Sequence, residues 1–254
     1  TNPLLLNAYS GSVSTIVNIL VVGATGKTGM PLVQQLLGRN HNVRIVVRSL
    51  HKLPTDIMEN PNTTAIEASI LDLTDEEMAN HVKGCNAVVS CLGHTMDFKG
   101  IFGEPKKLCT DATRRLCKAL QKDGLRKPTK FILMNTVGVQ NPDLAEKRAW
   151  FERGLLTLLR YTLPPQRDNE TAAKYLHDVI GKENKRIEWC SVRPDSLIDA
   201  EVSPYDITES PITGILSGRP TARSNVAHFM AELIENEELW SAWKFRMPVI
   251  MNSS

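Results

Sequence analysis

The chain has 254 residues, of which 42% are hydrophobic and 23% charged, and its formal net charge is +2. This length suits one globular domain with a full hydrophobic core. The near-neutral charge and the lack of long Lys and Arg runs argue against a nucleic-acid-binding protein. The longest apolar run, residues 16–22, is far shorter than the roughly 20 residues that cross a bilayer. We therefore expect neither nucleic acid nor a membrane as a partner.

Residues 1–14 have neither a basic start nor a long apolar stretch, so we interpret them as a flexible N-terminal segment rather than a signal peptide. The five cysteines form no C-x-x-C pair, and most of them lie in apolar patterns. This favours buried free thiols over disulfides, and thus a reducing, cytoplasmic location. No His or Cys spacing indicates a metal site.

Short apolar segments alternate with helical ones along the chain, which is typical of βαβ units around a parallel sheet. The expected strands are residues 16–22, 43–47, 63–68, 87–92, 131–135 and 187–192, with a short last strand near Phe245. The expected helices are residues 27–38, one from a capping box at Thr74 and Glu77, one along 108–120, then 168–180 and about 225–234. We predict an α/β fold: a Rossmann-type doubly wound parallel sheet in a single domain, residues 15–254.

The segment from Gly23 to Gly29, GATGKTG, lies directly between the first expected strand and the first helix. Gly23 allows the tight turn, Gly26 lets the backbone approach a pyrophosphate, and Gly29 lets the helix pack closely. The helix N-terminus offers N–H groups and partial positive charge to the phosphates. The spacing is G-x-x-G-x-x-G, and it is too short upstream for a Walker P-loop. The expected cofactor contacts here are Gly23, Thr25, Gly26, Lys27, Thr28 and Gly29; the alternative is a tight turn without a ligand.

The end of the second strand selects between the two nicotinamide dinucleotides. NAD-binding folds usually place an acidic residue there for the ribose 2′-hydroxyl. This strand instead ends in Val46-Val47-Arg48-Ser49, with Lys52 nearby and no carboxylate. The planar guanidinium of Arg48 suits a 2′-phosphate. We therefore expect NADP(H); the alternative is that Arg48 is a solvated loop residue.

Several further motifs accompany the glycine-rich segment. They are Asn86-Ala87-Val88-Val89 leading to Leu92-Gly93, Val192-Arg193-Pro194, and Ser224 to Met230. Together with residues 21–29 and 46–48, they resemble the atypical short-chain dehydrogenase/reductases, above all NmrA-like proteins and biliverdin reductase B, a flavin reductase. The likeness runs from about residue 16 to 250, and it implies an NADP(H) cofactor and a small-molecule substrate.

The resemblance also implies contacts beyond the phosphates. The family's Gly-Asp pair after the third strand, which holds the adenine, is matched here by Ala68-Ser69, followed by Ile70. The Asp is missing, so Ser69 and Ile70 are expected to contact the adenine more weakly. After the fourth strand, Leu92, Gly93 and His94 are expected under the adenine ribose and pyrophosphate, although His94 is equally well read as a loop residue without a ligand.

The reaction is expected at the carboxyl ends of the strands. Thr136 follows the fifth strand, where the wider family has its catalytic Ser or Thr, and its hydroxyl would stabilise charge on a substrate carbonyl. Lys174 stands where the family's catalytic Lys would be, but Glu170 fills the place of the Tyr. Tyr161 and Tyr175 are the alternatives as proton donors, and solvent is another.

Two segments are expected to shape the substrate side. Residues 138–167 carry apolar side chains at helical spacing and are interpreted as an inserted helical segment, either packed on the domain or forming a lid. Residues 195–254 form a small C-terminal region on the substrate side. The function we predict is NADPH-dependent hydride transfer to a flavin-like, quinone-like or carbonyl acceptor. The alternative is a non-catalytic NADP(H) sensor of the NmrA type, and a sugar-nucleotide epimerase is a more distant third.

Overall fold

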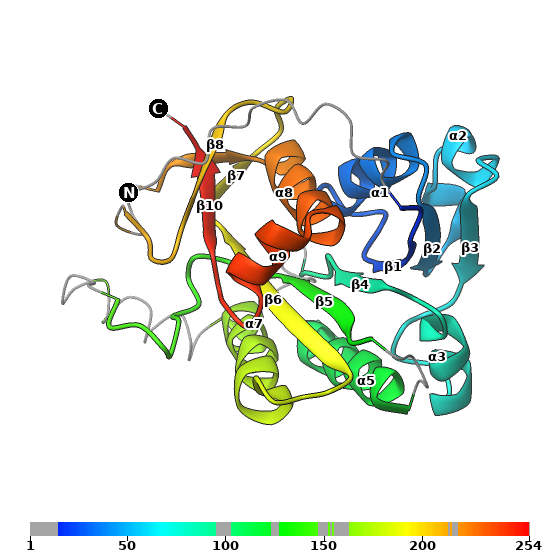
Figure 1. The fold of residues 1–254 in the computed structure, drawn as a ribbon, viewed down its shortest axis with the longest axis horizontal. Helices are drawn as coiled ribbons and strands as arrows, with labels where there is room; N and C mark the ends of the chain where they lie inside the picture. Colours follow the sequence, from blue (N-terminus) through cyan, green and yellow to red (C-terminus); the bar gives the residue numbers. More distant parts are fainter. Residues whose placement is uncertain are drawn as a thin grey trace.

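The computed structural model describes residues 15–94, 103–122, 127–146, 152, 154, 163–212, 214 and 218–253. Its centre is an eight-stranded sheet with the order β3-β2-β1-β4-β5-β6-β10-β8 (Figure 1). The strands are β1 Asn18–Val22, β2 Asn42–Val47, β3 Thr63–Glu67, β4 Ala87–Ser90, β5 Thr129–Met134, β6 Ile187–Pro194, β8 Tyr205–Thr208 and β10 Val249–Asn252. Every neighbouring pair is parallel except β10 and β8. The predicted Rossmann-type doubly wound sheet is confirmed.

Helices cover both faces of the sheet (Figure 1). On one face lie α1 (Gly29–Gly38), α8 (Arg223–Glu235) and α9 (Glu237–Trp243), and on the other lie α3 (Asp75–Val82), α5 (Leu108–Lys122) and α7 (Pro164–Lys174). A π-helical turn, η2 (Tyr175–Ile180), continues α7. Shorter elements are η1 (Leu50–Lys52), α2 (Thr55–Met58) and a two-stranded parallel sheet of β7 (Ser196–Ile198) and β9 (Pro220–Ala222).

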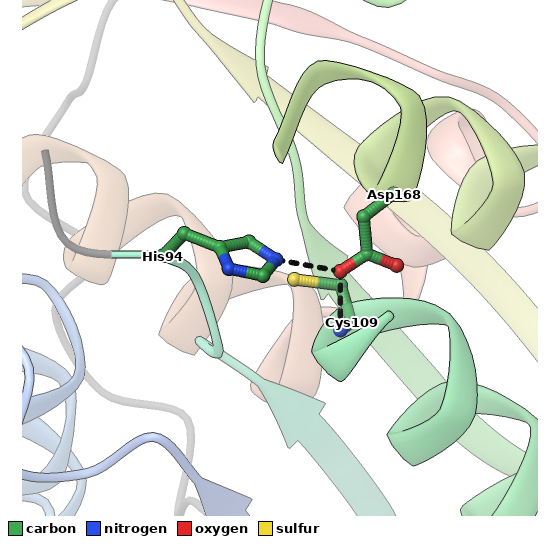
Figure 2. A group of neighbouring side chains, drawn as sticks. All are labelled: His94, Cys109 and Asp168. Atoms are coloured by element: carbon green, nitrogen blue, oxygen red, sulfur yellow. Dashed lines mark hydrogen bonds and ion pairs between the residues drawn. The ribbon is translucent and has the colours of Figure 1, made fainter. Parts of the chain in front are cut away.

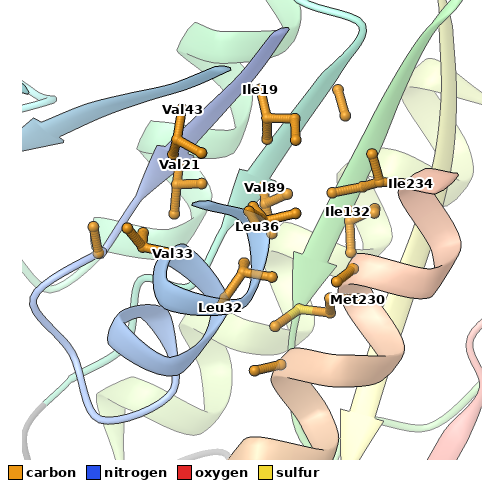
Figure 3. Packing of buried hydrophobic residues seen from close by; sticks show 14 of the residues in the cluster. Ile19, Val21, Leu32, Val33, Leu36, Val43, Val89, Ile132, Met230 and Ile234 are labelled. Atoms are coloured by element: carbon orange, nitrogen blue, oxygen red, sulfur yellow. The ribbon is translucent and has the colours of Figure 1, made fainter. Parts of the chain in front are cut away.

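The sheet separates two hydrophobic cores because successive side chains of a strand point to opposite faces. In β1, Ile19 and Val21 join the core under α1 and α8, whereas Leu20 and Val22 join the core under α3, α5 and α7. Figure 3 shows the first of these cores from close by. Burial on both faces explains why the central strands are apolar throughout rather than alternating.

The helix start predicted at Thr74 is confirmed in detail, and this helix is α3. Thr74 accepts a hydrogen bond from the Glu77 backbone N–H at 3.2 Å, and the Glu77 carboxylate accepts one from the Thr74 backbone N–H at 2.7 Å. These two bonds form the capping box, which satisfies N–H groups that a helix start leaves unpaired.

A short strand closes the chain as predicted, but its predicted position near Phe245 is wrong. Phe245 follows α9, a helix that the sequence analysis did not predict, and its backbone has a φ of 62°. Its ring packs edge-on against Trp189, with the centroids 6.2 Å apart. Phe245 is therefore apolar because its ring packs against Trp189. The strand β10 begins four residues later, at Val249. The first helix also begins at Gly29, two residues later than predicted.

Parts of two expected segments lie outside the described residues. They are the N-terminal segment 1–14 and, within the insertion 138–167, residues 147–151, 153 and 155–162, which include Tyr161. The described start of the insertion, residues 138–146, leaves β5 as turns and irregular backbone. Among the described residues, no helix combines the length and the hydropathy that crossing a membrane requires.

Candidate functional site

The phosphate loop, residues 23–29, connects β1 to α1 and has no room for extra side chains. Gly23 adopts a φ of +80°, and a Cβ there would lie 2.6 Å from the carbonyl group of Cys91. A Cβ on Gly29 would lie 2.2 Å from the Gly23 carbonyl oxygen. Both distances are far below van der Waals contact, so glycine is required at each position. The loop is thus pressed against the ends of β1 and β4, the two strands between which the strand order reverses.

The start of α1 is open to an anion. Thr28, its N-cap residue, makes no side-chain cap hydrogen bond with any described residue, and the first turn contains no acidic residue. Gly26 N–H donates to Gly23 O at 3.0 Å, which closes the turn and leaves the next N–H groups at the helix start. Such N–H groups and the helix dipole favour a phosphate. The residues therefore fit the pyrophosphate of a dinucleotide.

Arg48 lies at the carboxyl end of β2 and is exposed. Across the part of the chain that the structure describes, no carboxylate forms an ion pair with it. Ser49 and His51 are held to each other by a 2.5 Å hydrogen bond beside it. The exposed guanidinium at this strand tip is compatible with the predicted contact to a 2′-phosphate.

Lys27 reaches from the phosphate loop toward the C-terminal region. Its Nζ lies 3.5 Å from Asp199 Oδ2, and both side chains are well exposed. Asp199 is also bound by Arg223 at 2.5 Å. These residues border a cavity of about 830 Å³ between α1, the start of α8 and residues 199–202. Exposed ion pairs contribute little free energy, so this contact leaves Lys27 able to turn toward a phosphate.

The predicted adenine residues follow β3. Ser69 is half-buried, and its carbonyl oxygen accepts hydrogen bonds from the N–H groups of Asp72 and Leu73. Ile70 is buried in the core under α3 and α5. Its side chain therefore stabilises the fold, and the predicted adenine contact would have to come from its backbone. The Ile70 carbonyl is bound by Arg115 at 3.1 Å, which fixes this turn.

Leu92, Gly93 and His94 leave β4 at the same edge of the sheet. The Cys109 thiol donates to the Leu92 carbonyl at 3.4 Å. The His94 ring is turned inward: its Nε2 lies 2.9 Å from Asp168 Oδ2, and its side chain is only 5% exposed (Figure 2). His94 is therefore not a solvated loop histidine. We call His94, Cys109 and Asp168 the His94 cluster.

Asp168 is the centre of the His94 cluster, and the sequence analysis missed it. Its side chain is fully buried on α7 and also accepts the backbone N–H groups of Cys109, at 2.8 Å, and Thr110, at 2.9 Å. It thereby caps the start of α5. Burial opposes ionisation of the carboxyl, but the hydrogen bonds from His94, Thr110 and Cys109 outweigh it and hold the Asp168 pKa below its ordinary value. No local signal marked this residue, because its partners lie 58 to 74 residues away.

The atoms of the His94 cluster lie within 4.8 Å of one another, close enough for a metal ion to be considered. Each of them already has a hydrogen-bond partner in the protein, as described above. Burial, followed by the nearby Asp168 charge, raises the Cys109 pKa well above its ordinary value, so the thiol stays protonated. Thiolate is the form that binds metals. The cluster is therefore described better by its hydrogen bonds than by coordination.

Thr136 follows β5, the strand next to β4, and is half-buried. Its hydroxyl oxygen accepts the Gly138 N–H at 3.3 Å, which leaves the hydroxyl hydrogen to donate. Asn135 fixes this residue: its Oδ1 accepts the Thr136 N–H at 2.9 Å, and its Nδ2 donates to the Asn169 carbonyl at 3.1 Å. Asn169 is next to Asp168 on α7, so one helix turn ties together the ends of β4 and β5.

The other predicted reaction residues lie on α7 and η2. Lys174 is 77% exposed on its side chain and pairs with Asp178 at 2.9 Å, an arrangement that does not favour the predicted catalytic role. Glu170, in the place of the family's Tyr, accepts a hydrogen bond from Gln166 at 3.0 Å. Tyr175 packs its ring against Arg114 of α5, 5.6 Å away, and burial raises its pKa. A phenol with a raised pKa and a ring directed to α5 is a poor proton donor for this edge.

A buried ion pair supports the segment that follows Thr136. Arg193 is fully buried in β6, and its guanidinium lies 2.6 Å from the Glu146 carboxylate, which is itself 1% exposed. The same guanidinium donates to the carbonyl oxygens of Val139, Met247 and Glu209 at 2.7 to 3.0 Å. Arg193 thereby joins the described start of the insertion to the C-terminal strands. In the sequence, Arg193 stands out only as part of the Val192-Arg193-Pro194 motif.

Comparisons of the sequence give one matching family and several curated relatives. A family model described as NAD(P)H-binding matches residues 23–237. A chloroplastic divinyl chlorophyllide a 8-vinyl-reductase of Cucumis sativus is 28% identical over 238 residues, 87% of this chain and 50% of its own. The chain spans half or less of the length of the curated relatives that it matches.

The solved structures share the fold. A short-chain dehydrogenase/reductase of Veillonella parvula in complex with NADP has a TM-score of 0.67 and 15% identity, and the match covers 94% of this chain and 96% of that one. An anaerobilin reductase of Escherichia coli O157:H7 has a TM-score of 0.65 and 16% identity, with 93% and 98% covered. At these identities the likeness establishes a common fold.

Proposed function

This chain belongs to the family of NAD(P)H-binding proteins, and on that premise we propose that it is an NADPH-dependent oxidoreductase acting on a small planar acceptor. The observation that carries the proposal is the phosphate loop. A Cβ added at Gly29 or Gly23 would lie 2.2 or 2.6 Å from backbone atoms, so neither position accepts a side chain. Among the described residues, the helix start that follows has no side-chain cap hydrogen bond from Thr28 and no acidic residue in its first turn. A helix start of this kind, with unpaired backbone N–H groups and no acidic side chain, favours the binding of an anion.

The cofactor is held by residues from three strand ends. The phosphate loop binds the pyrophosphate, Arg48 binds the 2′-phosphate, and the backbone from Leu92 to Gly93 lies under the adjacent ribose. The preference for NADPH over NADH rests on Arg48, because no carboxylate stands at the end of β2 to hold a free 2′-hydroxyl. Ser69 and the backbone of Ile70 border the adenine.

Reduced nicotinamide, when bound, supplies the hydride. The protein contributes orientation and hydrogen bonding at the ends of β4 and β5. Thr136 is held by Asn135 and by the Gly138 N–H, which leaves its hydroxyl hydrogen to donate to an acceptor oxygen. This bond strengthens as negative charge develops on that oxygen.

The acceptor class we propose is a conjugated planar molecule. The anaerobilin reductase and the vinyl-reductase to which this chain is similar are both named for reductions of extended conjugated molecules. A flavin, a quinone and a conjugated carbonyl share this electronic character.

A specific observation favours one second candidate, an NADP(H) sensor without turnover. The place of the family's Tyr is filled by Glu170, which is engaged by Gln166. A carboxylate there cannot act as the phenol does.

The two candidates are separated by following NADPH absorbance with the purified protein and a panel of flavins, quinones, aldehydes and conjugated enones. We expect NADPH consumption with at least one acceptor class. Thr136→Val should slow reduction of carbonyl acceptors roughly 10- to 100-fold and leave NADPH affinity unchanged. The matched control is Thr171→Val, which removes a hydroxyl that donates to the Arg167 carbonyl. Tight NADPH binding without consumption would instead identify a sensor.

A further inference from the structure

The turn that follows β3, residues 69–73, is held by a guanidinium from another element. Arg115, half-buried on α5, donates hydrogen bonds to three carbonyl oxygens of this turn, those of Ile70, Leu71 and Leu73. Carbonyl dipoles that converge on one point repel one another unless a cation lies between them. Arg115 supplies that cation, because a guanidinium carries five N–H donors and stays charged. The shape of this turn therefore depends on a residue 42 to 45 positions away.

The other contacts of the turn attach it to the core but do not replace the guanidinium. The side chains of Ile70 and Leu73 are buried in the core under α3 and α5. The Ser69 carbonyl accepts the N–H groups of Asp72 and Leu73 at 3.0 and 3.3 Å. Loss of Arg115 would leave three carbonyl oxygens without their donor, and the turn would have to rotate to solvate them. The core contacts would remain, so we expect a local rearrangement rather than unfolding.

The same turn begins beside the tip of β2. These two strands are parallel, with Val47 opposite Glu67, and the Ala68 N–H donates to the Val47 carbonyl at 2.8 Å. Ser69 therefore leaves the sheet beside Arg48, the residue proposed to bind the 2′-phosphate. Ser69 is half-buried, and its hydroxyl makes no hydrogen bond with any described residue. This hydroxyl can therefore meet the base of the same nucleotide.

Helix α5 also holds the segment on the other side of the proposed adenosine site. The Cys109 thiol of α5 donates to the carbonyl of Leu92, the residue after β4 that is proposed to lie under the ribose, at 3.4 Å. Cys109 and Arg115 belong to the same helix, which is a rigid element. One helix therefore fixes both segments between which the proposed function places the adenosine. Its two contacts set the distance from the turn after β3 to the segment after β4.

We propose that Arg115 is the positioning residue of the adenine site and presents the Ser69 hydroxyl to the 6-position of the purine. This inference rests on the proposed function, which places the adenine at Ser69 and Ile70. A hydroxyl can accept a hydrogen bond from the 6-amino group of adenine or donate one to a 6-oxo group. Ser69 itself therefore gives little preference between the two bases, and a carboxylate in its place should create one.

The test uses Ser69→Asp as a probe of the base and isothermal titration calorimetry as the measurement. The ligands are NADPH and its hypoxanthine analogue, which carries a 6-oxo group and a proton on N1 instead of the 6-amino group. A carboxylate accepts from the amino group but has no hydrogen for the oxo group. We expect the ratio of NADPH affinity to analogue affinity to rise about 10-fold or more over the wild type. An unchanged ratio would overturn the proposal, because Ser69 would then not meet the 6-position.

Arg115 is tested in the presence of this probe. Arg115→Met combined with Ser69→Asp should return the affinity ratio to within about threefold of the wild type, because the carboxylate no longer faces the base. Arg115→Lys, which keeps a cation, should retain part of the preference. The matched control is Arg114→Met combined with Ser69→Asp, since the Arg114 guanidinium lies 5.6 Å from the centroid of the Tyr175 ring and its loss should leave the ratio high. A ratio that stays equally high without Arg115 would overturn the proposal, whatever the loss of stability.

A second measurement needs neither cofactor nor turnover. Hydrogen exchange in the cofactor-free protein follows the N–H groups of Asp72 and Leu73, which are bound to the Ser69 carbonyl. Arg115→Met should speed their exchange about 10-fold or more and leave that of Met30 in α1 unchanged. Equal protection in variant and wild type, or an equal loss at Met30, would contradict a local role in the turn. Wild-type protein that binds neither dinucleotide would instead be a failure of the proposed function itself.

Discussion

The phosphate loop and the His94 cluster lie at the same edge of the sheet but are built from contacts of very different range. In the loop, Gly26 N–H donates to Gly23 O and Met30 N–H to Gly26 O, each within four residues. In the cluster, Asp168 reaches 59 residues back to Cys109 and 74 residues back to His94. The loop therefore depends on the absence of side chains, and the cluster on the packing of α5 against α7.

Among the variants that test the cofactor, Gly29→Ala should have the largest effect, because it changes the phosphate loop itself. Its Cβ would lie 2.2 Å from the Gly23 carbonyl oxygen, so the turn must open. We expect NADPH affinity to fall about 100-fold or more, equal to 2.7 kcal/mol or more, by isothermal titration calorimetry. Gly38→Ala is the control, since nothing lies within 4 Å of its Cβ. Equal affinity in both variants would show that the loop does not hold the phosphates.

Arg193→Met would destabilise the segment that follows Thr136, because Arg193 holds that segment in place. It leaves the Glu146 carboxylate, 1% exposed, buried without its cation. Removing one partner of a buried ion pair lowers the free energy of unfolding by about 3–5 kcal/mol. The urea concentration at the unfolding midpoint should therefore be lower than in the wild type. The control is Lys118→Met, which removes an ion pair whose two side chains are more than half exposed, and its midpoint should not move. A midpoint shift no larger than that of the control would contradict the buried pair.

Asp168→Asn tests whether the buried carboxylate of the His94 cluster makes the stability of the protein depend on pH. The Asp168 pKa is lowered in the folded protein, so the carboxylate adds stability above its unfolded pKa of about 3.9. That contribution is lost as the pH falls through the folded pKa. The Asn amide would also place its own N–H groups against the N–H donors that the carboxylate accepts, which should destabilise the fold by about 2 kcal/mol. In urea titrations at different pH, the difference in stability between wild type and variant should narrow below about pH 4. If the difference in stability between wild type and variant widened as the pH fell, the Asp168 pKa would be raised in the folded protein rather than lowered.

Arg48→Ala has the smallest expected effect and tests only the cofactor preference. Loss of charged hydrogen bonds to a 2′-phosphate should weaken NADPH binding about 10- to 100-fold, measured by fluorescence titration. NADH, which lacks that phosphate, should bind both proteins equally. Parallel losses for NADPH and NADH would place Arg48 outside the 2′-phosphate site.

The sheet and the phosphate loop could be predicted because their signals are local. Residues 16–22 are apolar enough to mark a buried strand, and the glycines that follow mark the turn by their spacing. The His94 cluster could not be predicted in the same way. His94 was singled out as a residue beside the cofactor, but nothing near Asp168 in the chain indicates that it caps α5. The last strand was predicted too early, near Phe245, because an apolar residue indicates burial but not the type of secondary structure in which it is buried.

The order of local residues by itself determined the βαβ alternation, the glycine-lined turn and the arginine at the tip of the second strand. Each depends on neighbours a few positions away, where backbone geometry fixes the distance. Tertiary structure alone decided that α7 delivers a buried carboxylate to the start of α5 and to the imidazole after β4. The stability of that charge comes from donors brought together by packing, and no stretch of chain contains them all.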